Sequence, residues 1–153
     1  MDTIDKKILA LLQEDATLTV NELAGRVGLS PNPCWRRVQR LEADGVIRKR
    51  VTLLNAAALN AGVTVFVAIK TSQHSAAWFK SFSKNVNAIP EVMEFYRMSG
   101  EVDYLLRVVV PDIAGYDAVY KRLIKVADLL DVSSAFAMEQ MKYTTALPLN
   151  HAV

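Results

Sequence analysis

Apolar residues recur at helical spacing through the N-terminal part of the chain. Isoleucines and leucines follow this spacing in TIDKKILALLQED, which predicts a first helix. In LTVNELAGRVG, Thr19 and Glu22 have the spacing of a capping box, and Gly28 stands where a helix ends. A third helix is expected over residues 30–44, with Ser30 as its N-cap and Pro31 at its first position. Two helices joined by the short turn GLS, with another helix in front, are typical of a helix-turn-helix.

The predicted third helix has two chemically different faces. At about 100° per residue, Cys34, Val38 and Leu41 form one apolar seam. Polar residues occupy the opposite side: Asn32, Arg36, Gln39 and Arg40. We therefore expect Cys34 to face the core and the arginines to face solvent.

The pattern changes after Gly45. Apolar residues flank a basic centre in VIRKRVTLLN, which predicts a strand or small wing beside the helices. The next stretch, NAAALNAGV, is interpreted as a linker or a short helix, because both charge and periodicity change there. We expect a winged helix-turn-helix domain over residues 1–54 and a linker over residues 55–61.

The second half of the chain alternates between strand and helix patterns. VTVFVAIKT, VMEFYRMSG, VDYLLRVVV and VSSAFAMEQMKY predict strands, the middle two joined by a tight GE turn. HSAAWFKSFSKNVNAI and DIAGYDAVYKRLIKV predict helices. The order β-α-β-β-α-β makes the chain an α+β protein, with a ferredoxin-like sheet over residues 62–153 and both helices on one face.

The first strand of this sheet is polar on neither side. Valines and Ile69 line one side, and Thr64, Phe66 and Ala68 line the other. Because the helices cover only one face of the sheet, we expect a second subunit against the other face. The sequence thus predicts an obligate dimer as the smallest assembly.

Charge is distributed unevenly along the chain, although the net charge is only +2. Residues 26–50 contain seven basic and two acidic side chains, whereas residues 53–153 contain nine of each. A basic segment in a near-neutral chain indicates one module that faces a polyanion and another with a different task. On charge alone, a solvated basic face explains the pattern equally well.

Membrane spans, disulfides and metal sites are not expected. The apolar runs at residues 63–69 and 105–110 are far shorter than the roughly 18 residues that a membrane span requires. Because the first residues are charged rather than signal-like, a cytoplasmic protein is predicted. One cysteine cannot form an internal disulfide, and His74 and His151 lack metal-ligand spacing. No cofactor is expected.

The polar face of the third helix and the basic wing supply the candidate DNA contacts. Amide side chains suit adenine edges, and guanidinium groups suit guanine or phosphate. The candidates are Ser30, Asn32, Trp35, Arg36, Arg37, Gln39, Arg40, Arg48, Lys49 and Arg50. Arg37 and the three wing residues are interpreted as phosphate contacts, whereas packing is an alternative for Trp35. A reactive thiol is the alternative for Cys34, and its apolar neighbours argue against it.

These motifs resemble the Lrp/AsnC (feast/famine) transcriptional regulators over almost the whole chain. The diagnostic stretches are LSPNPCWRRVQRLE in the helix-turn-helix, MSGEVDYLLRV in the sheet domain and the closing YTTALPL. HSAAWF, FYRMSGEVDYLLRV and FAMEQMKYTTALPL are most similar to the cysteine-responsive branch of that family. The resemblance implies a sheet domain that pairs into dimers, dimers that often assemble into octamers or similar rings, and a small amino acid bound between dimers.

The resemblance also implies where that amino acid binds. The family's GxxD turn matches the residues from Gly100 to Asp103, where glycine allows close backbone approach and the carboxylate can pair with an ammonium group. The positions carried over are Met98, Gly100, Val102, Asp103, Tyr104, Ser133, Ser134 and Phe136. Without the resemblance, SGEVD is an ordinary hairpin turn and Tyr104 is equally a sheet-core residue.

The sequence therefore favours a DNA-binding transcriptional regulator controlled by a small amino acid, with a lean towards cysteine and no catalytic role. One alternative is a largely nonspecific DNA-organising protein whose second domain serves only oligomerisation. A further alternative is an enzyme that uses Cys34, which would lose activity but keep its DNA affinity after a Cys34→Ala change.

Overall fold

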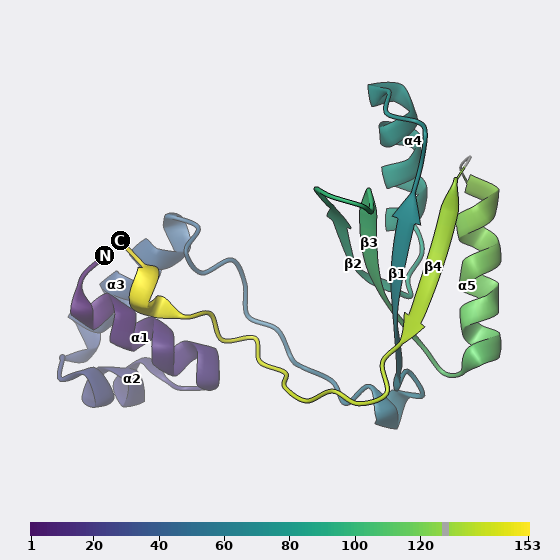
Figure 1. The fold of residues 1–153 in the computed structure, drawn as a ribbon. Coiled ribbons are helices and arrows are strands. Elements are labelled where there is room, and N and C mark those ends of the chain that lie inside the picture. The colour runs from purple at the N-terminus through teal and green to yellow at the C-terminus, as the bar shows by residue number, and fades with distance from the viewer. Residues whose placement is uncertain (127–128) are drawn as a thin grey trace. The chain divides into compact units, whose positions relative to one another are not determined.

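A computed structural model describes residues 1–126 and 129–153 of the chain (Figure 1). The chain forms two compact units, which are described separately. The first unit contains residues 1–53 together with residues 141–153, and the second contains residues 54–140. Within the described ranges, no helix combines the length and the apolar character needed to cross a membrane.

The elements follow one another in the order that the sequence predicts for helices and strands. They are α1 (Thr3–Glu14), α2 (Val20–Val27), α3 (Pro31–Ala43), η1 (Ala57–Leu59), β1 (Val63–Lys70), α4 (Ala76–Asn87), β2 (Val92–Arg97), β3 (Tyr104–Val110), α5 (Ile113–Val126), β4 (Asp131–Phe136) and η2 (Leu149–His151).

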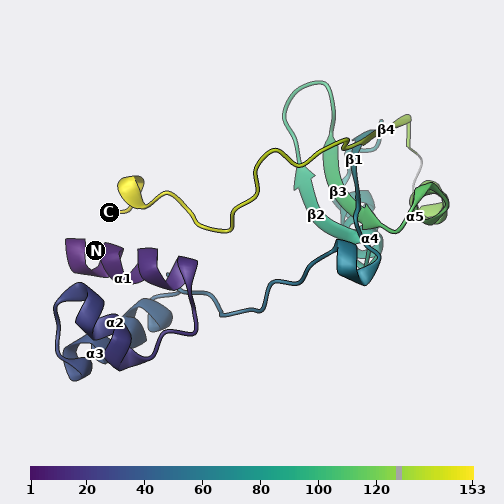
Figure 2. The same ribbon diagram turned by 90° about the horizontal axis from the view of Figure 1, so that it is seen from below.

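Side-chain capping begins α1 and α2, two of the three helices of the first unit, which appear together in Figure 2. The predicted capping box is confirmed, since Thr19 accepts from the Glu22 N–H group and the Glu22 carboxylate accepts from the Thr19 N–H group. Gly28 ends α2 with φ 73°, a left-handed conformation that favours glycine. Ser30 occupies the N-cap of α3, but its side chain makes no capping hydrogen bond. The helix-turn-helix prediction is confirmed.

The core of the first unit lies between these three helices. Ile8 and Cys34 are completely buried, and Leu23 and Leu41 are almost so. These side chains pack with other apolar residues of α1, α2 and α3 into one cluster. The apolar periodicity of each helix therefore faces a common interior.

The expected wing strand is not formed. Residues 46–55 have no regular secondary structure, although the Ile47 N–H group bonds to the Leu41 carbonyl and holds the start of the segment against α3. A strand needs a neighbouring strand for its backbone hydrogen bonds, and the described residues of the first unit contain none. The segment thus follows α3 where the wing was expected, but it does not form a strand.

The C-terminal segment differs from the sequence-based expectation in two ways. The last strand was expected to continue to Tyr143 but ends at Phe136, and residues 141–153 group with the first unit rather than the second. The Gln13 amide accepts from the Leu147 N–H group at 2.6 Å and donates to the Leu147 carbonyl at 3.2 Å. Leu149 then packs on the three-helix core, so the C-terminal turn lies alongside α1 (Figure 1).

The second unit is the predicted ferredoxin-like fold. Its four strands lie in the order β2-β3-β1-β4, and all three pairings are antiparallel (Figure 1). Side chains of β1 and β3 alternate between buried and less buried positions, as the period of a strand requires. Phe82 from α4 and Val119 from α5 join Val65, Val67 and Leu106 of the strands in one core. Both helices therefore cover the same face of the sheet.

The opposite face of the sheet carries apolar side chains that are open to solvent. Phe66 is 42% exposed and Tyr96 is 50% exposed. The register places Phe66 beside Arg107, whose guanidinium group pairs with Glu94 at 2.9 Å. This open face is the one on which a second subunit is expected.

Candidate DNA-binding face and effector pocket

Helix α3 divides into a buried and an exposed face as predicted. Cys34 is 0% exposed and Leu41 is 2% exposed, whereas Asn32, Arg36 and Gln39 are exposed. The N-terminal half of α3, which in a helix-turn-helix approaches base edges, presents Asn32 and Arg36 to solvent. The Arg36 side chain is exposed and forms no ion pair with any described residue.

Cys34 has the environment of a core residue. Its thiol is buried among the apolar side chains of the three helices. Burial raises the pKa of the Cys34 thiol, and the nearby positive charge of Arg37 only partly opposes this effect. A raised pKa disfavours the thiolate that a nucleophile or redox sensor needs.

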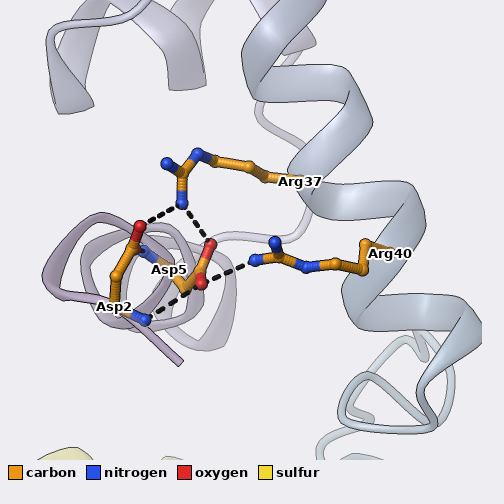
Figure 3. Close-up of polar contacts among 4 residues, drawn as sticks. All are labelled: Asp2, Asp5, Arg37 and Arg40. Atoms are coloured by element: carbon orange, nitrogen blue, oxygen red, sulfur yellow. Dashed lines mark hydrogen bonds and ion pairs between the residues drawn. The ribbon is translucent and has the colours of Figure 1, made fainter.

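Arg37 and Arg40 are not free, contrary to what their place on a basic helix suggests. Both reach back to carboxylates at the start of α1 (Figure 3). The Arg37 Nη1 atom lies 2.6 Å from Asp2 Oδ2 and 2.8 Å from Asp5 Oδ1, and Arg40 Nη2 lies 2.7 Å from Asp5 Oδ2. The two arginines therefore join α3 to α1.

This ion cluster perturbs its own ionisation. The pKa of Asp2 is lowered to about 2 by the backbone hydrogen bond from Asp5 and by the hydrogen bond from Arg37. The same contacts with Asp2 and Asp5 raise the pKa of Arg37. Both shifts favour the charged forms of Asp2 and Arg37.

The remaining DNA candidates lie on exposed parts of the first unit. Arg48 and Lys49 are exposed in the wing, whereas Arg50 pairs with Glu42 at 2.9 Å. Trp35 is 50% exposed, so its side chain packs only partly against the rest of the protein. Gln39 donates to Glu42 at 3.0 Å from an exposed position.

The second unit contains a hollow of about 300 Å³ beside the turn that follows β2. Its lining residues come from the N-terminal end of α4 and from the β2–β3 hairpin: His74, Ser75, Ala76, Phe79, Arg97, Met98, Asp103 and Tyr104. Three of the predicted effector residues, Met98, Asp103 and Tyr104, are thus brought together. Gly100 and Val102 belong to the same turn but do not line the hollow.

Backbone hydrogen bonds hold Asp103 in place. Its N–H group donates to the Ile69 carbonyl at 2.9 Å, and its own carbonyl accepts from the Met98 N–H group at 2.8 Å. Its Oδ2 atom accepts from the Thr71 N–H group at 2.9 Å. Oδ1 has no hydrogen bond to any described residue, so one oxygen of a fixed carboxylate remains for a ligand. Gly100 has φ 116°, which allows the chain to turn between the strands.

The hollow combines opposite charges with an apolar wall. Arg97 lies directly across from Tyr104 in the β2–β3 register, so a guanidinium group and the Asp103 carboxylate line one small space. Ser75 caps α4 by accepting from the Trp78 N–H group, which places the positive end of the helix dipole nearby. Such a set of groups can hold an ammonium and a carboxylate together.

Sequence reasoning missed His74, Phe79 and Arg97. The signal for Arg97 lies in strand register, because the residue that precedes Met98 must pair with Tyr104 once the hairpin closes. Tyr104, for which the sequence left sheet core and effector contact open, is a core residue that also borders the hollow. It is 5% exposed in the core, with its ring 6.0 Å from that of Phe79, and it also lines the hollow.

The predicted residues of β4 lie away from this hollow. Ser134 and Phe136 face the helices, where the Ser134 hydroxyl bonds to the Tyr116 hydroxyl and the Phe136 ring lies 5.4 Å from the Tyr116 ring. Ser133 points to the opposite face, where it pairs with Ala68. The structure therefore divides the predicted effector set between two places.

Metal ligation has no basis in the described part of the chain, which contains no group of three His, Cys, Asp or Glu side chains able to hold an ion.

Two protein-family models match the chain. Residues 1–48 match the family described as winged helix-turn-helix DNA-binding, and residues 64–147 match the Lrp/AsnC ligand binding domain. The DNA-binding transcriptional activator DecR of Escherichia coli is 51% identical over 150 residues, which cover 97% of this chain and 99% of that protein.

Two solved structures are similar over the whole chain. The crystal structure of an AsnC family transcriptional regulator from Agrobacterium tumefaciens has 63% identity and a TM-score of 0.97, and the match covers 100% of both chains. A transcriptional regulator from Neisseria meningitidis, solved as a complex with L-Met, has 36% identity and a TM-score of 0.94, covering 100% of this chain and 99% of that one. The exposed face of α3, the ligand-binding sheet domain and these likenesses together identify the chain as a DNA-binding transcriptional regulator of the Lrp/AsnC family.

Proposed function

We propose that α3 reads the major groove through Asn32, Arg36 and Gln39, while an amino acid bound in the hollow of the second unit controls DNA binding. The observation that carries the first half is the division of α3 into a fully buried apolar face and an exposed polar face. Arg48 and Lys49 contact phosphates from the wing. Arg37 and Arg40 are assigned to the contact between α3 and α1 instead of to DNA.

The charges around the hollow suit an amino acid. Asp103 takes the α-ammonium group, and Arg97, assisted by the N-terminal end of α4, takes the α-carboxylate. Met98 and Phe79 offer a polarisable, apolar wall to the side chain. Sulfur makes favourable contacts with aromatic rings, so cysteine is our first candidate effector and methionine, which the Neisseria meningitidis relative binds, is the second.

Assembly is part of the proposal. The open sheet face, with Phe66 and Tyr96 exposed, is assigned to the dimer interface, and dimers assemble further into octamers in the cytoplasm. Sedimentation velocity tests this: a monomer at micromolar concentration would reject the interface. No catalytic role is proposed for any residue of the chain.

The test of the function is fluorescence anisotropy on DNA from the gene's own upstream region and on scrambled DNA, with each of the twenty amino acids. The expected result is a specific complex whose affinity changes with one or a few amino acids. Equal binding to both DNAs with no amino-acid effect would favour a nonspecific DNA organiser.

Asp103→Asn tests the effector site itself. Asparagine keeps an acceptor for the Thr71 N–H group but removes the charge, so DNA binding should persist while the amino-acid response is lost. Glu101→Gln is the matched control, since Glu101 is an exposed carboxylate of the same turn that does not line the hollow. A normal response in Asp103→Asn would show that the site is misplaced.

A further inference from the structure

Arg37 and Arg40 are basic residues of the DNA-binding helix that already have negative partners inside the protein. We propose that Asp2 and Asp5 are specificity-determining counter-ions, which keep these two arginines from binding DNA phosphates and so limit nonspecific DNA binding. The inference rests on the DNA-binding function proposed above.

The geometry ties both arginines to one buried carboxylate. The side chain of Asp5 is 2% exposed, and each of its oxygens bonds to a different arginine, Oδ1 to Arg37 and Oδ2 to Arg40 (Figure 3). Oδ2 also accepts from the Asp2 N–H group at 3.1 Å. A buried carboxylate that loses its positive partners is costly. Either arginine that turned towards DNA would therefore remove one of the two cations that pair with this buried carboxylate.

The charges within the cluster cancel, since two carboxylates face two guanidinium groups. Arg36, between Cys34 and Arg37 in the same helix turn, has no such partner among the described residues and remains exposed. The basic excess of the helix-turn-helix is therefore smaller towards DNA than its sequence indicates. The arginines left for DNA are those that the protein does not neutralise itself.

This arrangement has a measurable consequence in salt dependence. Each phosphate that a protein neutralises steepens the plot of log affinity against log salt by about 0.9. An arginine held by Asp5 neutralises no phosphate and adds nothing to that slope. Releasing one arginine should steepen the slope by about 0.9, which is an additional loss of about 3.5-fold in affinity between 50 and 200 mM salt.

The experiment compares Asp5→Asn and Asp2→Asn with Glu14→Gln in the full chain. Glu14 is an exposed carboxylate at the other end of α1 without an ion pair among the described residues, so it gives the same change in net charge elsewhere. Asparagine is as good an N-cap as aspartate, and therefore Asp2→Asn preserves the start of α1. Affinity for cognate and scrambled DNA is measured by anisotropy from about 50 to 200 mM salt, after thermal unfolding has confirmed the fold.

The salt slope should be steepest for Asp5→Asn and intermediate for Asp2→Asn. Glu14→Gln should have the same slope as the wild type. Scrambled DNA should gain more affinity than cognate DNA in both aspartate variants, because phosphate contacts carry no sequence information. If Asp5→Asn does not fold, Asp2→Asn decides the question, with a slope at least about 0.4 steeper than that of Glu14→Gln.

Equal slopes for the aspartate variants and the control, or an unchanged ratio of cognate to scrambled affinity, would overturn the inference and reduce the cluster to a structural contact. Failure of the wild-type protein to bind either DNA would reject the DNA-binding function, and this inference with it. The two failures are distinguished by the wild-type measurement alone.

Discussion

Arg36 and Arg37 are adjacent in the sequence, but replacing each by alanine should affect a different property. Arg37→Ala should lower stability, whereas Arg36→Ala should lower DNA affinity. Arg37→Ala removes one of the two cations on Asp5, whose side chain is 2% exposed. Breaking a buried ion pair costs about 3 to 5 kcal/mol. Since Arg40 still pairs with Asp5, we expect roughly half of that, about 2 kcal/mol, which lowers the melting temperature of a small domain by about 10 °C.

Arg36→Ala removes an exposed side chain without an ion pair among the described residues. We expect stability to change by no more than about 0.5 kcal/mol. Cognate DNA binding should weaken by about 1 to 3 kcal/mol if Arg36 reads a base, with a smaller loss on scrambled DNA.

Urea unfolding and DNA anisotropy on the same two variants separate these effects. A double-mutant cycle with Asp5→Asn isolates the interaction between Arg37 and Asp5. Arg37→Ala should lower the free energy of unfolding by less once the Asp5 carboxylate has been replaced by a neutral amide. The reasoning is refuted if Arg36→Ala destabilises the protein as much as Arg37→Ala does, or if Arg37→Ala leaves stability unchanged.

Three further predictions concern single side chains of the first unit. Because Cys34 is buried and burial raises the pKa of its thiol, an aromatic disulfide reagent at mildly alkaline pH should label it only after denaturation, and rapid native labelling would support a reactive thiol. The pKa of Asp2 is lowered from 3.8 to about 2 by a backbone hydrogen bond and by Arg37, so its charge stabilises the folded state above about pH 4 and loses this effect as the pH falls towards 2. The difference in unfolding free energy between wild type and Asp2→Asn should shrink over that range, and a difference independent of pH would contradict the assignment. Leu149→Ala should lower the urea-unfolding free energy of the first unit by about 1 kcal/mol, since its side chain is partly buried, whereas Leu147→Ala, with 72% of that residue exposed, should change it little.

Much of the fold follows from short-range patterns in the sequence. The capping box of α2, the glycine at its end and the prolines that begin α3 involve residues within a few positions of one another. The inward position of Cys34 follows from helical periodicity alone. Such features depend on local geometry, which one sequence records directly.

Features that depend on distant residues were not predictable in this way. Arg37 lies 32 residues from Asp5, and neither helix pattern indicates that the side chains meet. Arg97 reaches the hollow only through the register of β2 with β3. The apolar pattern also did not predict that β4 ends at Phe136. The Ala137 N–H group donates to the Thr64 carbonyl, and the pairing stops there because the partner strand β1 begins at Val63.

The attachment of residues 141–153 to the first unit affects the order of events during synthesis. The ribosome releases α1, α2 and α3 first, and these helices can begin to pack around Ile8 as soon as α3 has emerged. The hydrogen bond between Gln13 and Leu147 and the packing of Leu149 on the helix core can nevertheless form only after the whole sheet unit has been translated. A fragment that ends at residue 53 would therefore leave one side of α1 uncovered. The DNA-binding unit is completed only after the sheet unit has been synthesised.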